Sequence, residues 1–225
     1  MKRFFLTLDD FLRGRGIFSP DAPLYGRLKW LFILLLTSGV LYGVVMGTFS
    51  GLTPGRFHQL IYSGAKVPLL LIVTFLLCLP SFFVINTVAG LRDDFGQVLR
   101  AVVATQSGVT VVLACLAPFT AFFYLSCSDY RLALLFNGFM FFIATVSSQI
   151  IVRRYYNPLI KRSPTHRHLR TAWYFLYIFV GIQMAWVLRP FIGDPNAPVA
   201  FFRSDAWGNA YLIVGKLIID ALKRL

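Results

Sequence analysis

The sequence predicts an all-α integral membrane protein: a polytopic bundle of five transmembrane helices with a short interfacial helix at each end. Three observations predict it. Of the 225 residues, 57% are apolar and 14% are charged, whereas soluble domains have roughly 45–50% and 25%. Five apolar stretches are each long enough to cross a bilayer, which takes about 20 helical residues. The basic residues gather between these stretches, as juxtamembrane charges do.

The five stretches divide the chain into three parts. Residues 1–29 form an N-terminal segment, residues 30–192 form the transmembrane domain, and residues 193–225 form a C-terminal segment. The predicted spans cover residues 30–49, 67–90, 101–125, 132–152 and 171–192. Five spans place the two termini on opposite sides of the membrane.

The distribution of Lys and Arg predicts the orientation. Segments 1–29, 91–100 and 153–170 together hold 14 of the 22 basic residues, and the segments on the opposite side, Arg56 and Lys66 among them, hold seven. Positively charged connections are retained in the cytoplasm. We therefore expect the N-terminus inside and the C-terminus outside.

Each terminal segment contains a candidate amphipathic helix. Residues Phe4, Phe5, Leu8, Phe11 and Leu12 recur at helical spacing. This helix either lies on the anionic lipid headgroups at the cytoplasmic face or packs under the bundle. Residues 211–222 are too short to cross and lie either on the outer leaflet or against the bundle.

A helix-packing face is predicted in the first span. Gly39, Gly43 and Gly47 repeat at every fourth residue, so they share one edge of the helix and allow another backbone to approach closely. The sequence leaves open whether that backbone belongs to the same chain or to another subunit.

Polar side chains gather toward the predicted cytoplasmic ends of spans two to four. The candidate ligand pocket is formed by Asn86, Asp93, Asp94, Gln106 and Gln149. The alternative is that these groups satisfy one another between helices, where such hydrogen bonds contribute about 0.6–2 kcal/mol.

The end of the last span is rich in charged and aromatic residues. Arg189, Asp194, Arg203 and Trp207 fall within a short run of sequence on the predicted outer side. They form either a structural cap over the bundle or a docking surface with arginine and aromatic anchors.

Composition argues against most catalytic and metal chemistry. The chain has no Glu, and its three cysteines, Cys78, Cys115 and Cys127, form no CxxC pair. We therefore expect no metal site, no cofactor and no catalytic residues. The net charge of +13 is interspersed with apolar runs, which favours membrane lipids over nucleic acid as the charged partner.

Two resemblances accompany this prediction. The run Pro23-Leu24-Tyr25-Gly26 before the first of five spans is similar to the motif that precedes the bundle of Yip1-domain membrane proteins, which implies an adaptor that acts through partners. The Leu91-Arg92-Asp93-Asp94 run and the RPFIGDP to WGNAY segment resemble uncharacterised bacterial inner-membrane proteins, which implies a bacterial inner-membrane location and no particular activity.

We therefore expect a non-enzymatic membrane scaffold or accessory subunit of a larger membrane assembly, with a protein partner or as a homo-oligomer. The alternative is a small transporter or channel subunit that uses the cytoplasm-facing polar pocket. A lipid-modifying enzyme is the third candidate, with only Asp93, Asp94 and Arg92 to supply its chemistry.

Overall fold

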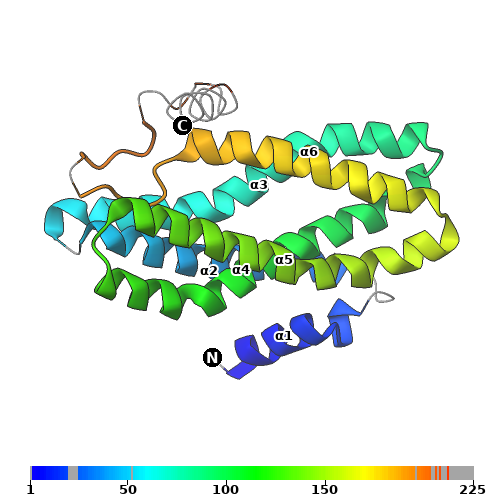
Figure 1. The fold of residues 1–225 in the computed structure, drawn as a ribbon. Helices are drawn as coiled ribbons and strands as arrows, with labels where there is room; N and C mark the ends of the chain where they lie inside the picture. Colours follow the sequence, from blue (N-terminus) through cyan, green and yellow to red (C-terminus); the bar gives the residue numbers. More distant parts are fainter. Residues whose placement is uncertain are drawn as a thin grey trace, which may run out of the picture.

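The computed structural model describes residues 2–19, 25–51, 53–195 and 197–203, and the single residues 206, 208 and 212. All regular elements in this part of the chain are helical (Figure 1). The α-helices are α1 (Lys2–Arg13), α2 (Tyr25–Gly47), α3 (Phe57–Val88), α4 (Phe95–Ser126), α5 (Tyr130–Arg162) and α6 (Thr165–Leu188). The last five belong to segments that are long and apolar enough to cross a membrane. The predicted all-α class and the five candidate spans are confirmed, and the orientation stays a prediction.

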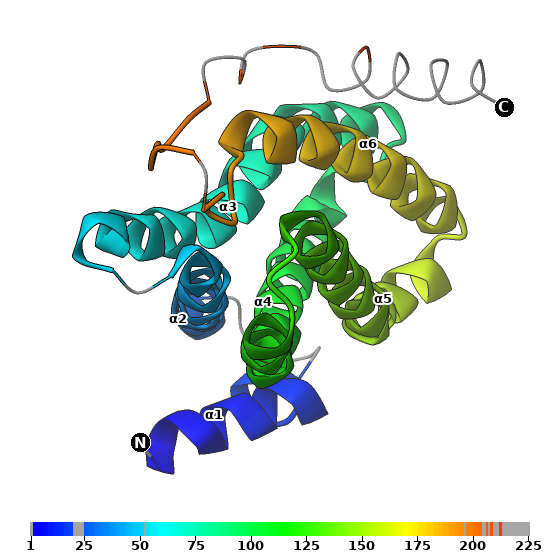
Figure 2. The same cartoon turned by 60° about the vertical axis from the view of Figure 1, so that its left-hand side comes forward.

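The five long helices form an open arc (Figure 2). Helix α2 packs against both α3 and α4, while α4 packs against α5 and α3 packs against α6. Helices α5 and α6 are consecutive in sequence, yet they pack on each other only weakly. The order along the arc is therefore α5, α4, α2, α3 and α6, and the arc does not close between its two ends.

Several helices are longer than the apolar stretches that predict them. Helix α3 begins at Phe57 and has 32 residues, which makes it about 48 Å long, whereas the hydrocarbon core of a bilayer is about 30 Å thick. Helix α5 continues through Arg162, and α6 ends at Leu188. Hydropathy detects only the apolar part of a helix, so α3 and α5 must tilt or project beyond the membrane.

The glycine face of α2 packs against α3 of the same chain. A Cβ atom built on Gly43 would lie 2.8 Å from the Cα atom of Gly64, and one built on Gly47 would lie 2.8 Å from the Cα atom of Leu60. At Gly39 the nearest atom is 3.3 Å away, on Pro68. Because these neighbours include backbone atoms, a larger side chain at Gly43 or Gly47 would force the helices apart.

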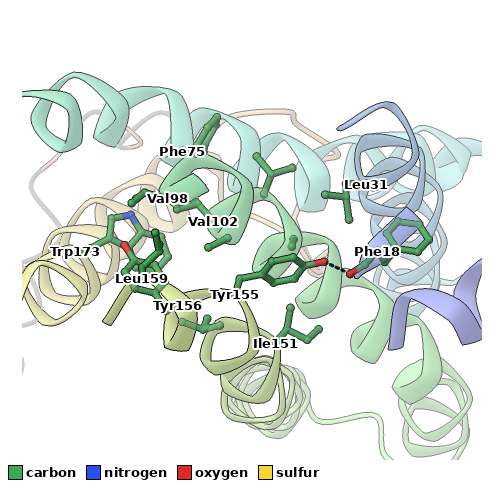
Figure 3. Close-up of a cluster of buried hydrophobic side chains, with 14 of the residues drawn as sticks. Phe18, Leu31, Phe75, Val98, Val102, Ile151, Tyr155, Tyr156, Leu159 and Trp173 are labelled. Atoms are coloured by element: carbon green, nitrogen blue, oxygen red, sulfur yellow. Dashed lines mark hydrogen bonds between the residues drawn. The ribbon is translucent and has the colours of Figure 1, made fainter. Parts of the chain in front are cut away.

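Buried side chains form two clusters along the bundle. One cluster lies at the α1 end and includes Phe75, Val102, Tyr156 and Trp173 (Figure 3). The other lies toward the opposite end, around Tyr42. Large apolar side chains also remain exposed on the outward sides of the spans, as a lipid-facing surface requires. Examples with more than half of their surface exposed are Leu76, Phe119, Phe122, Leu135, Phe142, Ile150 and Phe175.

The end of α1 is attached to the bundle. Phe11 and Phe18 are buried, with 1% and 0% of their surfaces exposed. Arg154 of α5 donates to the carbonyl groups of Phe11 and Leu12, and the Tyr155 hydroxyl donates to the Phe18 carbonyl at 2.8 Å (Figure 3). This end of α1 thus packs under the bundle, while contact of α1 with lipid headgroups stays a prediction. The C-terminal helix predicted over 211–222 lies outside the described residues apart from residue 212.

We predict that Gly43→Leu lowers the free energy of unfolding by about 1–3 kcal/mol, the usual cost of overpacking a close contact. Thermal unfolding of the purified protein in detergent measures this effect. Gly96→Leu is the matched control, because nothing lies within 4 Å of a Cβ atom at Gly96. Unchanged stability together with an altered oligomeric mass in Gly43→Leu would instead place the glycine face between subunits.

Candidate functional site

The chain that follows α6 crosses the end of α3 without regular structure. We call the described part of residues 189–203 the cap segment. Three side chains, from α3 and the turn before it, donate to its carbonyl groups: Lys66 to Pro190 at 2.7 Å, Ser63 to Phe191 at 2.5 Å, and Arg56 to Asp194 at 2.9 Å and to Pro195. Four carbonyl groups of the cap segment therefore accept hydrogen bonds from side chains in place of helical N–H groups.

Side-chain packing also fixes the cap segment. Ile192 is 1% exposed and belongs to the buried cluster around Tyr42. Gly193 approaches both α3 and the turn after α2 so closely that a built Cβ atom would lie 2.8 Å from Gln59 and 2.7 Å from Ser50. A larger residue at Gly193 would therefore lift the cap segment away from the bundle.

Lys66 is a fully buried cation, with 0% of its surface exposed. Its ammonium group lies 4.8 Å from the centroid of the Phe201 ring in addition to its bond with Pro190. Among the described residues no carboxylate lies within ion-pair distance of it, and Arg203 is close enough to repel its charge.

The sequence places Lys66 just before the second span, as a loop charge, whereas the structure places it inside α3. Its burial was missed because the partner carbonyl comes from a distant part of the chain.

Three of the four residues predicted for the outer cap or docking surface gather around the Tyr130 hydroxyl. Arg203 donates to this oxygen at 3.3 Å. Arg189 and Asp194 also act on it electrostatically. The Arg189 guanidinium in addition stacks on Trp186, with its Cζ atom 3.3 Å from the ring centroid. The fourth residue, Trp207, lies outside the described residues.

A cavity of about 550 Å³ lies where the arc of helices fails to close. Its walls come from α5 and α6, its floor comes from α2 and α3, and one end is formed by the cap segment. The lining is mostly apolar and includes Leu70, Leu71, Leu134, Gly138, Phe141, Ile178, Gly181, Ile182, Ala185 and Phe191. Arg189, Arg203 and Tyr130 line the cavity as well. An apolar trough thus has a strongly basic end.

A buried hydrogen-bond network borders this cavity. Asn137 accepts from the Tyr42 hydroxyl at 3.0 Å and donates to the Tyr124 hydroxyl at 2.6 Å. Thr120 donates to the Tyr42 oxygen at 3.4 Å, so the network joins α2, α4 and α5. Thr74 lies on the α3 side, where its buried hydroxyl has no hydrogen-bond partner in the described structure. Sequence reasoning missed Asn137, although a mid-span amide is a signal for such a network.

The amides of the predicted cytoplasmic pocket bond within their own helices or not at all. Asn86 donates to the Phe82 carbonyl, and Gln149 donates to the Thr145 carbonyl. Gln106 is 4% exposed, and its Nε2 atom has no hydrogen-bond partner among the described residues. These three side chains make no hydrogen bond with one another in the described part of the chain.

The two carboxylates of that predicted pocket differ from each other. Asp93 is exposed. Asp94 lies 3.0 Å from the Nε2 atom of buried His166 and 3.6 Å from Arg162. Asp94 therefore ties the start of α4 to the junction of α5 and α6, which is a structural contact at the end of the bundle opposite the cap segment.

The described cavity lining offers groups that can bind a ligand. It contains guanidinium, hydroxyl and amide groups, but no carboxylate, imidazole or thiol. Among the residues that the structure describes, no three His, Cys or Asp side chains lie close enough together to hold a metal ion. No family model, curated protein or solved structure matches the chain. The similarities to Yip1-domain proteins and to bacterial inner-membrane proteins thus stay predictions.

We predict that Lys66→Met loosens the cap segment, because the Pro190 carbonyl loses a charge-assisted hydrogen bond of about 1.5–3 kcal/mol. Hydrogen exchange followed by mass spectrometry should show faster exchange across residues 191–203 and unchanged exchange in α4. Lys29→Met, at an exposed lysine, is the control. Equal protection of residues 191–203 in both variants would contradict the role assigned to Lys66.

Proposed function

We propose that the protein is a non-enzymatic, multi-pass membrane protein that acts as a scaffold or accessory subunit of a larger membrane assembly. The observation that supports this proposal best is the cap segment. Its irregular backbone is held in one shape by Arg56, Ser63 and Lys66. A rigid, non-helical surface at the end of a bundle is suited to recognition, because binding it costs little conformational entropy.

Apolar side chains next to the cap segment support the same proposal. Phe57 and Ile61 at the start of α3 are 60% and 56% exposed, and Phe202 is 43% exposed. Phe202 is linked to α3 through Phe201, whose ring packs edge-on against Tyr62. We call Phe57, Ile61 and Phe202 the docking surface. Exposed apolar groups of this kind mark contact sites when they lie beyond the hydrocarbon core.

The length of α3 bears on where this surface lies. A helix of 32 residues is longer than the hydrocarbon core by roughly 18 Å. If the apolar stretch from residue 67 fills the core, the first ten residues of α3 project into water or headgroups. In the predicted orientation the docking surface then faces outward from a bacterial inner membrane, toward a protein partner or a second copy of the chain.

A second candidate function is a small transporter or channel subunit. The buried Oδ1 atom of Asn86 and the Nε2 atom of Gln106 favour it, because both lack a hydrogen-bond partner among the described residues. A polar ligand or water at the predicted cytoplasmic ends of the helices would satisfy such groups.

We predict that the protein purifies from its native membranes in mild detergent as a stoichiometric complex or a defined homo-oligomer. The double variant Phe57→Ala/Phe202→Ala should dissociate it, because buried aromatic anchors at an interface contribute about 2 kcal/mol or more each. Mass determination of the intact particle is the measurement.

The matched control is Phe122→Ala/Phe175→Ala, which changes two exposed aromatic residues on the spans. This control should leave the particle mass unchanged. A bare 25.5 kDa monomer from native membranes would contradict the scaffold proposal and favour the transporter or channel alternative.

A further inference from the structure

The cavity between α5 and α6 is built for the apolar part of a membrane molecule. Its walls carry Leu134 and Phe141 on α5 and Ile178 and Ile182 on α6. Helices α5 and α6 meet only weakly, so the cavity lies at the unclosed side of the arc. The apolar walls offer water no hydrogen-bond partners, so in a bilayer water is a poor filling for this part of the trough. A hydrocarbon chain is therefore the expected filling.

The basic end of the cavity supplies what a plain lipid-facing crevice lacks. Arg189 and Arg203 line it, and Lys66 lies close enough to Arg203 to feel its charge. Asp194 is a carboxylate that acts on Tyr130 within this cluster. Among the residues that the structure describes, positive charge therefore exceeds negative charge where the cavity meets the cap segment.

The position of this cluster along the helices matches the level of lipid phosphates. Arg189 directly follows the last residue of α6, and Tyr130 is the first residue of α5. The ends of spanning helices lie at the interface between hydrocarbon and headgroups, where aromatic and basic residues bind lipid headgroups. An acyl chain in the cavity would thus place its headgroup beside the two arginines.

We propose that the cavity binds an anionic phospholipid, with one acyl chain between α5 and α6 and its phosphate held by Arg189 and Arg203. Guanidinium groups bind phosphate oxygens through paired N–H donors. The cavity volume of about 550 Å³ lies within the range of roughly 300–1,000 Å³ that is typical of small-molecule sites. The proposal is independent of the scaffold function, since it concerns the isolated chain.

Charge and shape separate this ligand from other occupants. A free phosphate ion would use the arginines but would leave the apolar trough empty. A zwitterionic lipid would fill the trough, but its cationic headgroup would face Arg189 and Arg203. An anionic phospholipid is complementary to both parts of the cavity.

Native mass spectrometry of the purified, delipidated chain tests the proposal. The probes are phosphatidylglycerol and phosphatidylcholine with identical acyl chains. We expect tighter binding of phosphatidylglycerol at a single site. Arg189→Gln and Arg203→Gln should each weaken that binding roughly tenfold to a hundredfold, since each removes a charge-assisted contact. Arg131→Gln, at an exposed arginine of the same end, should leave it unchanged.

Two further variants separate binding from damage to the fold. Tyr130→Phe removes the hydrogen bond to Arg203 but keeps both charges, so it should retain the preference for phosphatidylglycerol. Gly138→Leu should block both lipids at the site, because a Cβ atom there meets nothing within 4 Å and points into open space. Gly96→Leu, which is equally unhindered, should bind as the unmodified chain does.

Specific outcomes would overturn the proposal. Equal affinity for the two lipids would show that the site does not recognise the lipid headgroup. If Tyr130→Phe lost the preference for phosphatidylglycerol, that preference would depend on the Tyr130 hydroxyl and not on the charges of Arg189 and Arg203. If the chain bound no lipid but bound inorganic phosphate, and Gly138→Leu still bound the phosphate, the cluster would be a simple anion site. Unchanged lipid binding in Gly138→Leu would place the lipid elsewhere.

Discussion

The attachment of the chain beyond α6 to one side of α3 determines the shape of the molecule. Lys66 and Ser63 hold the carbonyl groups of Pro190 and Phe191, and Ile192 is buried in the bundle. These contacts fix the end of α6 beside α3 instead of beside α5, its neighbour in sequence. Burying a lysine is costly unless its ammonium group is hydrogen-bonded, so the cap segment and Lys66 stabilise each other.

The open arc follows from this attachment. Helix α2 is fixed between α3 and α4, because its glycines admit the α3 backbone at contact distance. With α6 held on the far side of α3, nothing closes the space next to α5, and the cavity remains. The same contacts that shape the cap segment bring Arg189 and Arg203 to the end of that cavity. The docking surface and the basic cavity are thus two consequences of one set of bonds, although we propose a different partner for each.

The sequence predicts the helices better than their arrangement. Apolar length reveals the five spans, and the four-residue spacing of Gly39, Gly43 and Gly47 reveals a close helix contact, because both are local patterns. Lys66 looks like a loop charge, since the carbonyl that binds it lies 124 residues further along the chain. The cavity escapes sequence analysis for a similar reason. From the sequence, apolar residues such as Leu134 and Ile178 would be expected to face lipid. They line the cavity because α5 packs only weakly on α6.

Disulfide trapping between α6 and its two possible neighbours tests the arrangement most directly. A Cβ atom at Gly181 would lie 3.7 Å from the Thr74 side chain, whereas one at Gly138 would meet no atom within 4 Å. In a chain without its native cysteines, the pair Thr74→Cys/Gly181→Cys should oxidise more readily than a pair across the cavity, because the Thr74 Cγ2 atom is in contact with the Gly181 position and disulfides need closely spaced Cβ atoms. The pair Gly138→Cys/Gly181→Cys should stay reduced. Efficient trapping of the second pair without the first would show that α6 packs on α5, and would contradict the open arc on which the cavity depends.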